Sequence, residues 1–332
     1  MTNRLKNISL PFQLISTYRA ELMGFAILGV LCGHLMNVTY QPIVLAQIAR
    51  LLHTAGFIFL SGFGLYYAYT KNSDIKSFYK KRFTRIVIPF VLLTYWFFVI
   101  TLIDGIDTPL RFFTNITTLS FWLYGNVWAM WYVSVTLFLY LIFPLLYNFI
   151  FTKRNPAINL AILIVIYAIS LLILAFCVPE YWELTKLGYA RMILFPIGMY
   201  VGYLSKESKK ITLLQLFGYF IICGVLLVIS KLWLDDEIFA VMRTLFGIPL
   251  VVLFFQCMHN IRFANYIIFT PLAFMGKYSY EIYLIHMMIF YFFHHIVHLD
   301  FAYSMIIGIT IALLICQPTN KGIQHIMGKL QK

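Results

Sequence analysis

Long apolar runs, separated by short polar connections, follow one another along almost the whole chain. A helix rises about 1.5 Å per residue, so roughly 20 apolar residues cross the hydrocarbon core of a bilayer. Residues 263–275 are expected to lie along the membrane interface, and residues 109–119 to form an amphipathic segment in the longest outer connection. The pattern predicts an all-α, polytopic membrane bundle of about ten transmembrane helices, at residues 20–40, 43–69, 84–103, 127–151, 156–177, 188–204, 212–234, 238–258, 277–297 and 301–317.

The composition excludes a soluble globular protein. Hydrophobic residues make up 62% of the chain and charged residues 11%, against about 25% charged residues in a typical soluble domain. Too little polar surface remains to cover a soluble core. The five cysteines stand singly within apolar runs, without the spacing of a disulfide framework or a metal site. They are interpreted as small buried hydrophobic residues.

The distribution of charge predicts the orientation of the bundle. The formal net charge is +13, but 19 of the 25 Lys and Arg residues fall in alternate connections, which is typical of membrane topology rather than of a nucleic-acid-binding groove. By the positive-inside rule these connections and both termini face the cytoplasm. The chain is therefore divided into a cytoplasmic N-terminal segment (1–19), a transmembrane domain (20–317) and a cytoplasmic C-terminal tail (318–332).

Several ionisable residues lie inside predicted spans, where such groups are costly and are candidates for function. His34, toward the outer end of the first span, could take a proton from a hydroxyl or simply form an interhelical hydrogen bond. Arg50 and His53 lie in the second span, one turn apart on one helical face, and are expected at the depth of His34. Arg191 and Arg243 begin the sixth and eighth spans and either join this polar cluster or mark a membrane boundary.

A group of cations stands at the cytoplasmic start of the third span, in the sequence FYKKRFTR: Lys80, Lys81, Arg82 and Arg85. Four cations beside a helix N-terminus suit a polyphosphate, and anchoring to anionic lipid explains them as well. Arg19 begins the first span, about 22 Å along the helix from His34, and is most simply an interfacial anchor.

The ninth predicted span carries Glu281 and His286 within MGKYSYEIYLIH. Five positions correspond to about 140° around a helix, so the two side chains are not expected to pair directly. A carboxyl group at this depth needs a partner or a proton. The sequence contains no nucleophile elbow, phosphate-binding loop, dinucleotide fingerprint or zinc-protease motif. Trp122, Trp128 and Trp131 are interpreted as interfacial aromatic belts.

Taken in order, several short motifs resemble the membrane-bound acyltransferase-3 family over roughly residues 15–317. YRAELMGFAILGVLCGH is similar to the family's first-span Arg and His, and FIFLSGFGLYY to its aromatic run ending in Ser-Gly. Arg82 and Arg85 match the R-x-x-R that opens the third span. WAMWYVSVTLFLYLIFP and GKYSYEIYLIH are similar to a Trp-Tyr-x-Ser segment and a Ser-Tyr-x-x-Tyr-Leu-x-His segment. The family's usual Arg, eleven residues before the His, is replaced here by Met23, and the nearest Arg is Arg19.

The resemblance implies an O-acyltransferase that moves an acyl group, usually acetyl, from cytoplasmic acyl-CoA to a hydroxyl of a surface glycan or exopolysaccharide. It implies catalytic roles for His34, Arg19 and Glu281, with His34 deprotonating the acceptor or carrying the acyl group briefly. Acyl-CoA is then a donor substrate, and no bound cofactor or metal is expected. The implied substrate-binding residues are Arg82, Arg85, Lys81, Arg50, His53, Ser61, Arg191, Tyr280 and His286.

The expected partners are acyl-CoA, a glycan or lipid-linked glycan acceptor and the lipid bilayer, with no nucleic acid. The expected location is a multi-pass position in a bacterial cytoplasmic membrane, and the sequence leaves room for a homo-oligomer or an envelope-biosynthesis partner. The alternative function is a transporter or flippase for a glycan or lipid-linked intermediate. Against it, the sequence shows no pair of broken helices and no inverted repeat.

Overall fold

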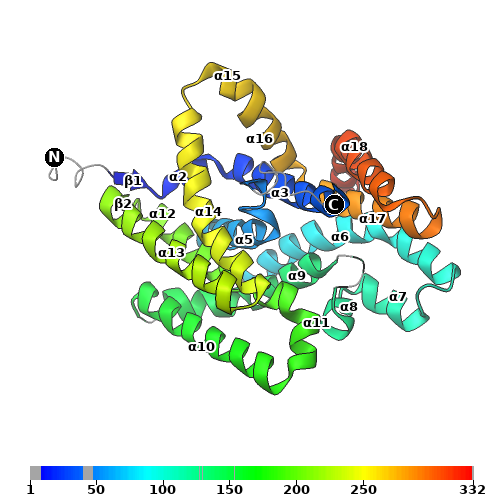
Figure 1. Cartoon of the computed structure of the whole chain (residues 1–332), viewed down its shortest axis with the longest axis horizontal. Helices are drawn as coiled ribbons and strands as arrows, with labels where there is room; N and C mark the ends of the chain where they lie inside the picture. The colour runs from blue at the N-terminus through cyan, green and yellow to red at the C-terminus, as the bar shows by residue number, and fades with distance from the viewer. Residues whose placement is uncertain (1–8, 40–47, 127, 129, 153, 331–332) are drawn as a thin grey trace.

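The computed structural model describes residues 9–39, 48–126, 128, 130–152 and 154–330 (Figure 1). This part of the chain is helical apart from two short strands, which confirms the predicted all-α membrane bundle. In the first half the elements are β1 (Ser9–Pro11), α2 (Gln13–Thr17), α3 (Arg19–Thr39), α5 (His53–Lys71), α6 (Ile75–Ile103), α7 (Pro109–Ile116), α8 (Ser120–Tyr124) and α9 (Trp131–Phe151).

The second half adds the remaining helices and the second strand, two of the helices being short π-helices. They are α10 (Pro156–Cys177), α11 (Pro179–Tyr189), α12 (Leu194–Lys206), β2 (Lys210–Thr212), α13 (Leu213–Trp233), α14 (Asp236–Met258), α15 (Arg262–Ala264), η1 (Asn265–Phe269), α16 (Thr270–Lys277), α17 (Ser279–Tyr291), η2 (Phe292–Ile296) and α18 (Phe301–Leu330).

Eight segments of the described chain are long and apolar enough to cross a membrane: α3, α6, α9, α10, the segment from α11 to α12, α13, α14 and α18. The other two predicted spans, at residues 43–69 and 277–297, contain the helices α5 and α17. Most residues of both are buried among other helices. A helix buried in the core is as apolar as one that faces lipid, so the apolar pattern alone does not separate the two.

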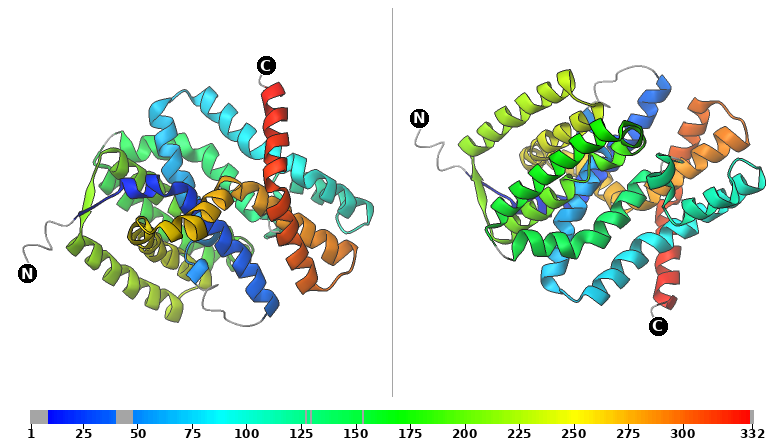
Figure 2. Two further views of the ribbon diagram at one scale, coloured as in Figure 1. Left: turned by 90° about the horizontal axis from the view of Figure 1, so that it is seen from above. Right: turned by 90° about the horizontal axis from the view of Figure 1, so that it is seen from below.

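The helices α10 and α13 lie at the periphery of the bundle (Figures 1 and 2). Few of their residues are buried, and their exposed side chains are large and apolar, as at Phe176 and Leu232. In water such surfaces would drive aggregation, whereas in a bilayer they face lipid tails. The two helices therefore form lipid-facing walls around the core.

The segment predicted to lie along the interface, residues 263–275, instead folds into α15, η1 and α16, and α16 packs lengthwise on α3. A Cβ on Gly24 of α3 would overlap the carbonyl oxygen of Leu272, and one on Gly276 would overlap that of Ala20. Lipid tails are as apolar as the helix surfaces, so close van der Waals packing between small residues holds such helices together. The two glycines thus fix α16 against the helix that carries His34.

The strands β1 and β2 pair antiparallel, with Leu10 opposite Ile211. They bring the segment before α3 and the connection between α12 and α13 to the same end of the bundle (Figure 1). Both segments belong to the set that the charge pattern predicts to be cytoplasmic. The pairing agrees with that alternation, and the side of the membrane stays a prediction.

Asp107 anchors the longest predicted outer connection. Its carboxylate is 4% exposed and accepts hydrogen bonds from Thr101 Oγ1 (2.9 Å), Asn115 Nδ2 (3.2 Å) and Trp128 Nε1 (3.1 Å). The helix α7 turns its polar Asn115 inward and apolar residues such as Leu110 outward, as expected for the amphipathic segment. Trp128 is therefore tied to a buried carboxylate while its own side chain is only partly buried, and its interfacial position stays a prediction.

Candidate active site

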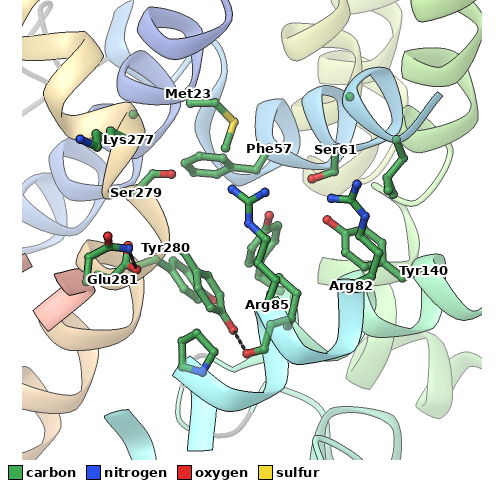
Figure 3. A pocket seen from close by; sticks show the side chains of 18 of the residues that line it. Met23, Phe57, Ser61, Arg82, Arg85, Tyr140, Lys277, Ser279, Tyr280 and Glu281 are labelled. Atoms are coloured by element: carbon green, nitrogen blue, oxygen red, sulfur yellow. Dashed lines mark hydrogen bonds between the residues drawn. The ribbon is translucent and has the colours of Figure 1, made fainter. Parts of the chain in front are cut away.

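A cavity of about 370 Å³ opens at the end of the bundle where α3, α6 and α17 begin (Figure 3). Residues along one side of α5, from Phe57 to Ala68, and the last turns of α18 complete its wall. Four cationic side chains line this cationic cavity: Arg19, Arg82, Arg85 and Lys277. The helix ends around it are those that the charge pattern assigns to the cytoplasmic side.

The face of α6 that lines the cavity follows the helical repeat. Arg82, Arg85, Ile86 and Pro89 are spaced at i, i+3, i+4 and i+7, so they share one side of the helix. Figure 3 shows Arg82 and Arg85 among the labelled residues of the cavity. Lys81 is exposed and does not line the cavity, so the structure separates it from the two arginines with which it was grouped.

Arg19 also belongs to the cavity, rather than serving only as an interfacial anchor. Its guanidinium lies against Gly64 of α5, where an added Cβ would be 2.6 Å from Arg19 Nη2. Arg82 and Arg85 are close enough to act electrostatically on it. None of the ion pairs formed within the described residues involves these three arginines. Like charges gathered without an ion-pair partner are costly, so the cavity is suited to an anion.

Glu281 faces the cavity and has the partner that its depth requires. Its side chain is 5% exposed, and Oε1 accepts a hydrogen bond of 2.6 Å from Asn320 Nδ2. Asn320 reaches Glu281 because α18 does not end at residue 317, as predicted, but continues to Leu330. Beside Glu281, the Tyr280 hydroxyl donates to the carbonyl of Ile86 at 2.9 Å and ties α17 to α6.

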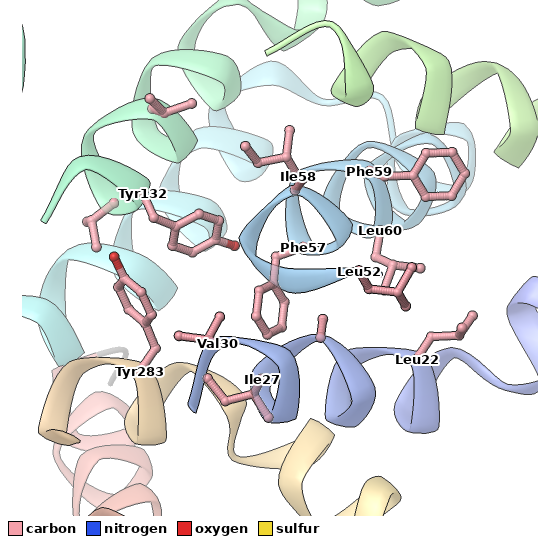
Figure 4. Close-up of a cluster of buried hydrophobic side chains, with 14 of the residues drawn as sticks. Leu22, Ile27, Val30, Leu52, Phe57, Ile58, Phe59, Leu60, Tyr132 and Tyr283 are labelled. Atoms are coloured by element: carbon pink, nitrogen blue, oxygen red, sulfur yellow. The ribbon is translucent and has the colours of Figure 1, made fainter. Parts of the chain in front are cut away.

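Aromatic side chains close the inner end of the cavity. Phe57, Ser61, Tyr132 and Tyr283 line this end. The ring centroids of Tyr132 and Tyr283 lie 5.2 Å apart, and those of Phe57 and Tyr132 lie 5.9 Å apart. Figure 4 shows these rings where α5, α9 and α17 meet, with Val30 of α3 beside them.

Two histidines lie on the other side of this aromatic layer. The His286 ring centroid is 6.0 Å from that of Tyr283 and 5.5 Å from that of His34. His286 is fully buried, and its Nδ1 lies 2.7 Å from the carbonyl oxygen of Ile282. A carbonyl only accepts, so Nδ1 carries the proton and Nε2 carries a lone pair. Among the described residues Nε2 has no hydrogen-bond partner, which leaves it free to accept a proton.

Arg50 and His53 also lie beside His34, but not on a continuous helix as expected. The helix α5 begins only at His53, whose φ of 44° is left-handed, and Arg50 lies in the preceding turn. A Cβ on Gly33 would be 3.1 Å from His53 Nε2 and 3.9 Å from Arg50 Nε. The break in the helix therefore turns both side chains toward the end of α3.

Two further arginines complete this group. Arg191, 6% exposed, pairs with Glu237 at 2.5 Å and lies 5.4 Å from the ring centroid of Trp131. Trp131 is thus buried against a cation rather than placed in a lipid-facing belt. Arg191 and Arg243 both act electrostatically on His53. We call this group the histidine–arginine cluster: His34, Arg50, His53, Arg191, Arg243 and His286.

The structure thus divides the predicted site residues into two groups. The cationic cavity contains Arg19, Ser61, Arg82, Arg85, Tyr280 and Glu281. The histidine–arginine cluster contains the predicted residues His34, Arg50, His53, Arg191 and His286, and Lys81 belongs to neither group. Tyr283 lines the cavity and contacts His286, so a single aromatic layer separates the two groups.

Sequence reasoning missed several residues of the cavity. Tyr132 and Tyr283 stand within motifs already noted, but their side chains could not be assigned to a site without the packing of α9 against α17. Asn320 and Gln324 fall after the last apolar run, where the sequence gives no signal for a buried partner.

The family model described as "Acyltransferase domain" matches residues 22–320. The match covers most of the chain, including the histidine–arginine cluster and nearly all of the cationic cavity, while Arg19 stands just before it. The protein therefore belongs to the acyltransferase 3 family and is a multi-pass membrane acyltransferase. Comparisons with curated proteins and with solved structures find no match to this chain.

Proposed function

We propose that the protein transfers an acyl group, acetyl in the simplest case, from cytoplasmic acyl-CoA to a hydroxyl of a cell-surface glycan or exopolysaccharide. It would act from the cytoplasmic membrane of a bacterium. One observation carries the proposal: three arginines that form no ion pair within the described part of the chain face a cavity that a single aromatic layer separates from a pair of histidines. A donor with several phosphates and a distant reactive end fits this arrangement.

The cationic cavity is assigned to the phosphates of the donor. Guanidinium groups bind phosphate oxygens through paired N–H donors, and Arg19, Arg82 and Arg85 offer three such groups around one space. Lys277 adds a fourth positive charge. With the phosphates held there, the thioester end points inward, toward Ser61 and Tyr283. Movement of the aromatic layer would then admit the acyl group to the histidines.

The histidine pair is assigned to the chemistry. The acceptor hydroxyl oxygen attacks the thioester carbonyl carbon while His34 takes the hydroxyl proton. The carbon–sulfur bond then breaks, the ester remains on the acceptor, and the thiolate leaves and takes up a proton as CoA. The His286 ring lies next to that of His34, and its Nε2 lone pair would accept a hydrogen bond from His34 once His34 is protonated. Transfer through a brief acyl-histidine would use the same residues.

Family membership supports an acyltransferase over the transporter that the sequence left open, because the matched family is one of acyltransferases. A transporter would also not consume the thioester. The direct test is glycan-dependent release of CoA thiol by the purified protein in proteoliposomes. Release that needs both acetyl-CoA and a glycan supports the proposal, whereas glycan transport without thiol release contradicts it.

A further inference from the structure

The histidine–arginine cluster carries more positive charge than the proposed chemistry uses. Arg50, Arg191 and Arg243 all act electrostatically on His53. In the described part of the chain, Glu237 is the one carboxylate that forms an ion pair with any of these arginines. Glu237 also acts electrostatically on Arg243, and Asp235, itself paired with Lys186, acts on Arg191, so three guanidinium groups face two carboxylates and positive charge stays in excess.

Arg50 and Arg243 are the members that form no ion pair among the described residues. Each has a buried Nε without a hydrogen-bond partner in the described residues, and each repels the other electrostatically. Thr244, next to Arg243 in α14, donates to the carbonyl of Leu52 at 3.4 Å and so holds α14 against the start of α5. Buried polar groups of a purely structural network are normally satisfied by partners. The Nε atoms of these two arginines have no such partner among the described residues, although the Arg243 guanidinium also lies 5.6 Å from the ring centroid of Phe239.

We propose that the histidine–arginine cluster binds an acidic acceptor, a glycan whose carboxylate or phosphate lies between Arg50 and Arg243 while a nearby hydroxyl reaches His34. This inference rests on the proposed function and specifies the chemical class of its acceptor. The position supports it, because Arg50 and His53 lie against Gly33, the neighbour of His34 in the chain. An anion bound there would be placed beside the proposed base.

The donor phosphates do not explain these charges. The donor has its own cations in the cavity, on the other side of Tyr283. A guanidinium fork matches the two oxygens of a carboxylate or a phosphate. The headgroup of an anionic lipid offers the same chemistry, so the experiment must distinguish an acceptor from the bilayer itself.

The experiment uses the full-length protein in nanodiscs of zwitterionic phosphatidylcholine. The probes are an oligosaccharide of glucuronic acid and the same oligosaccharide with its carboxyl groups reduced to alcohols. Both present similar ring hydroxyls and differ in charge. Binding is measured at low and high ionic strength, and CoA release from acetyl-CoA is measured in parallel. A second set of nanodiscs contains anionic phosphatidylglycerol.

The variants are Arg243→Gln and Arg243→Lys, with Arg111→Gln as the matched control. Arg111 is an exposed arginine of α7, outside both groups of site residues. The wild type is expected to bind the acidic probe at least about tenfold more tightly than the reduced probe, with a preference that weakens in salt. Arg243→Gln should bring the two affinities within about twofold, Arg243→Lys should keep part of the difference, and Arg111→Gln should keep all of it.

Equal or tighter binding of the reduced probe by the wild type would overturn the inference. Loss of the acidic preference when phosphatidylglycerol is added would also overturn it, because the site would then belong to lipid headgroups. Thermal unfolding of each variant shows whether the bundle is intact, and an intact Arg243→Gln that keeps the full preference counts against the site. Equal CoA release with the acidic and the reduced oligosaccharide would support the acyltransferase activity but overturn the proposed preference for an acidic acceptor. Arg243-dependent acid binding without any CoA release would instead support the anion site and contradict the proposed function.

Discussion

The imidazole rings of His34 and His286, from opposite ends of the chain, lie with their centroids 5.5 Å apart. The bond between His286 Nδ1 and the Ile282 carbonyl fixes the tautomer, so the lone pair of Nε2 remains available. His286 is therefore assigned as a positioning residue. It orients the His34 ring and accepts a hydrogen bond from His34 when His34 is protonated during the reaction. Neither residue shows this relationship from its own sequence context.

Replacing His286 by Phe should impair turnover rather than donor binding. Phe fills much of the volume of the buried ring but offers no nitrogen to His34. The kcat for CoA release is expected to fall roughly a hundredfold, within the range usual for loss of assisted proton transfer, while the KM for acetyl-CoA changes less than about threefold. Steady-state kinetics separate the two constants. A rise in KM with kcat unchanged would place His286 in donor binding instead.

The arginines of α6 should determine donor affinity. Arg82→Gln and Arg85→Gln each remove a charge-assisted contact to phosphate, worth about 1.5–3 kcal/mol, so the KM for acetyl-CoA should rise roughly tenfold to a hundredfold. Lys81→Gln is the control, because Lys81 adjoins Arg82 in the chain but does not line the cavity. If all three variants raised KM alike, general membrane electrostatics rather than a phosphate site would explain the cluster.

The helical repeat alone would have separated Lys81 from Arg82 and Arg85 without the structure. Residues 82, 85, 86 and 89 share one face of a helix, whereas residue 81 stands about 100° away from 82. The predicted depth of His34 and the expected failure of Glu281 and His286 to pair directly were also accessible, because they follow from positions along one helix. The structure agrees with the second of these, since Glu281 bonds to Asn320 and His286 lies beside His34, while the depth of His34 in the membrane stays a prediction.

Other features were not accessible from the sequence. Residues 48–52 continue the apolar pattern of α5 without a proline or glycine, so the turn that carries Arg50 gave no signal. Arg19 has the position of an interfacial anchor, and only the packing of α3 on α5 shows that it lies against Gly64. Asn320 follows the last apolar run and becomes a buried partner because α18 continues. Such contacts depend on tertiary packing, which a helical period does not encode.

Gly64→Ala should weaken donor binding without unfolding the protein. The added methyl group would meet the flexible guanidinium of Arg19, which can move aside, rather than backbone. Displacing it from the cavity should raise the KM for acetyl-CoA about threefold to tenfold at an unchanged thermal midpoint. Gly218→Ala is the control, since nothing lies within 4 Å of its added Cβ. Unchanged KM in Gly64→Ala would remove Arg19 from the donor site.

Asp107→Ala should destabilise the connection that ends α6. The substitution leaves Thr101, Asn115 and Trp128 without their shared acceptor, at a cost of about 1–3 kcal/mol for a buried unsatisfied group. The thermal midpoint, measured at one scan rate in the same detergent, should fall by several degrees. Asp104→Ala, at an exposed position of the same connection, should leave it unchanged. Equal midpoints for the two variants would argue against the buried network.

The central claim is that His34 performs acyl transfer from acyl-CoA to a glycan hydroxyl, and CoA release by matched proteoliposomes tests it most directly. Wild type and His34→Ala, with equal thermal midpoints, would receive acetyl-CoA with and without glycan. We expect glycan-dependent thiol release from the wild type and a loss of at least about a hundredfold in His34→Ala. Equal release from both proteins would contradict the role of His34. The absence of release from the wild type with every donor and acceptor tested would contradict the proposed reaction itself.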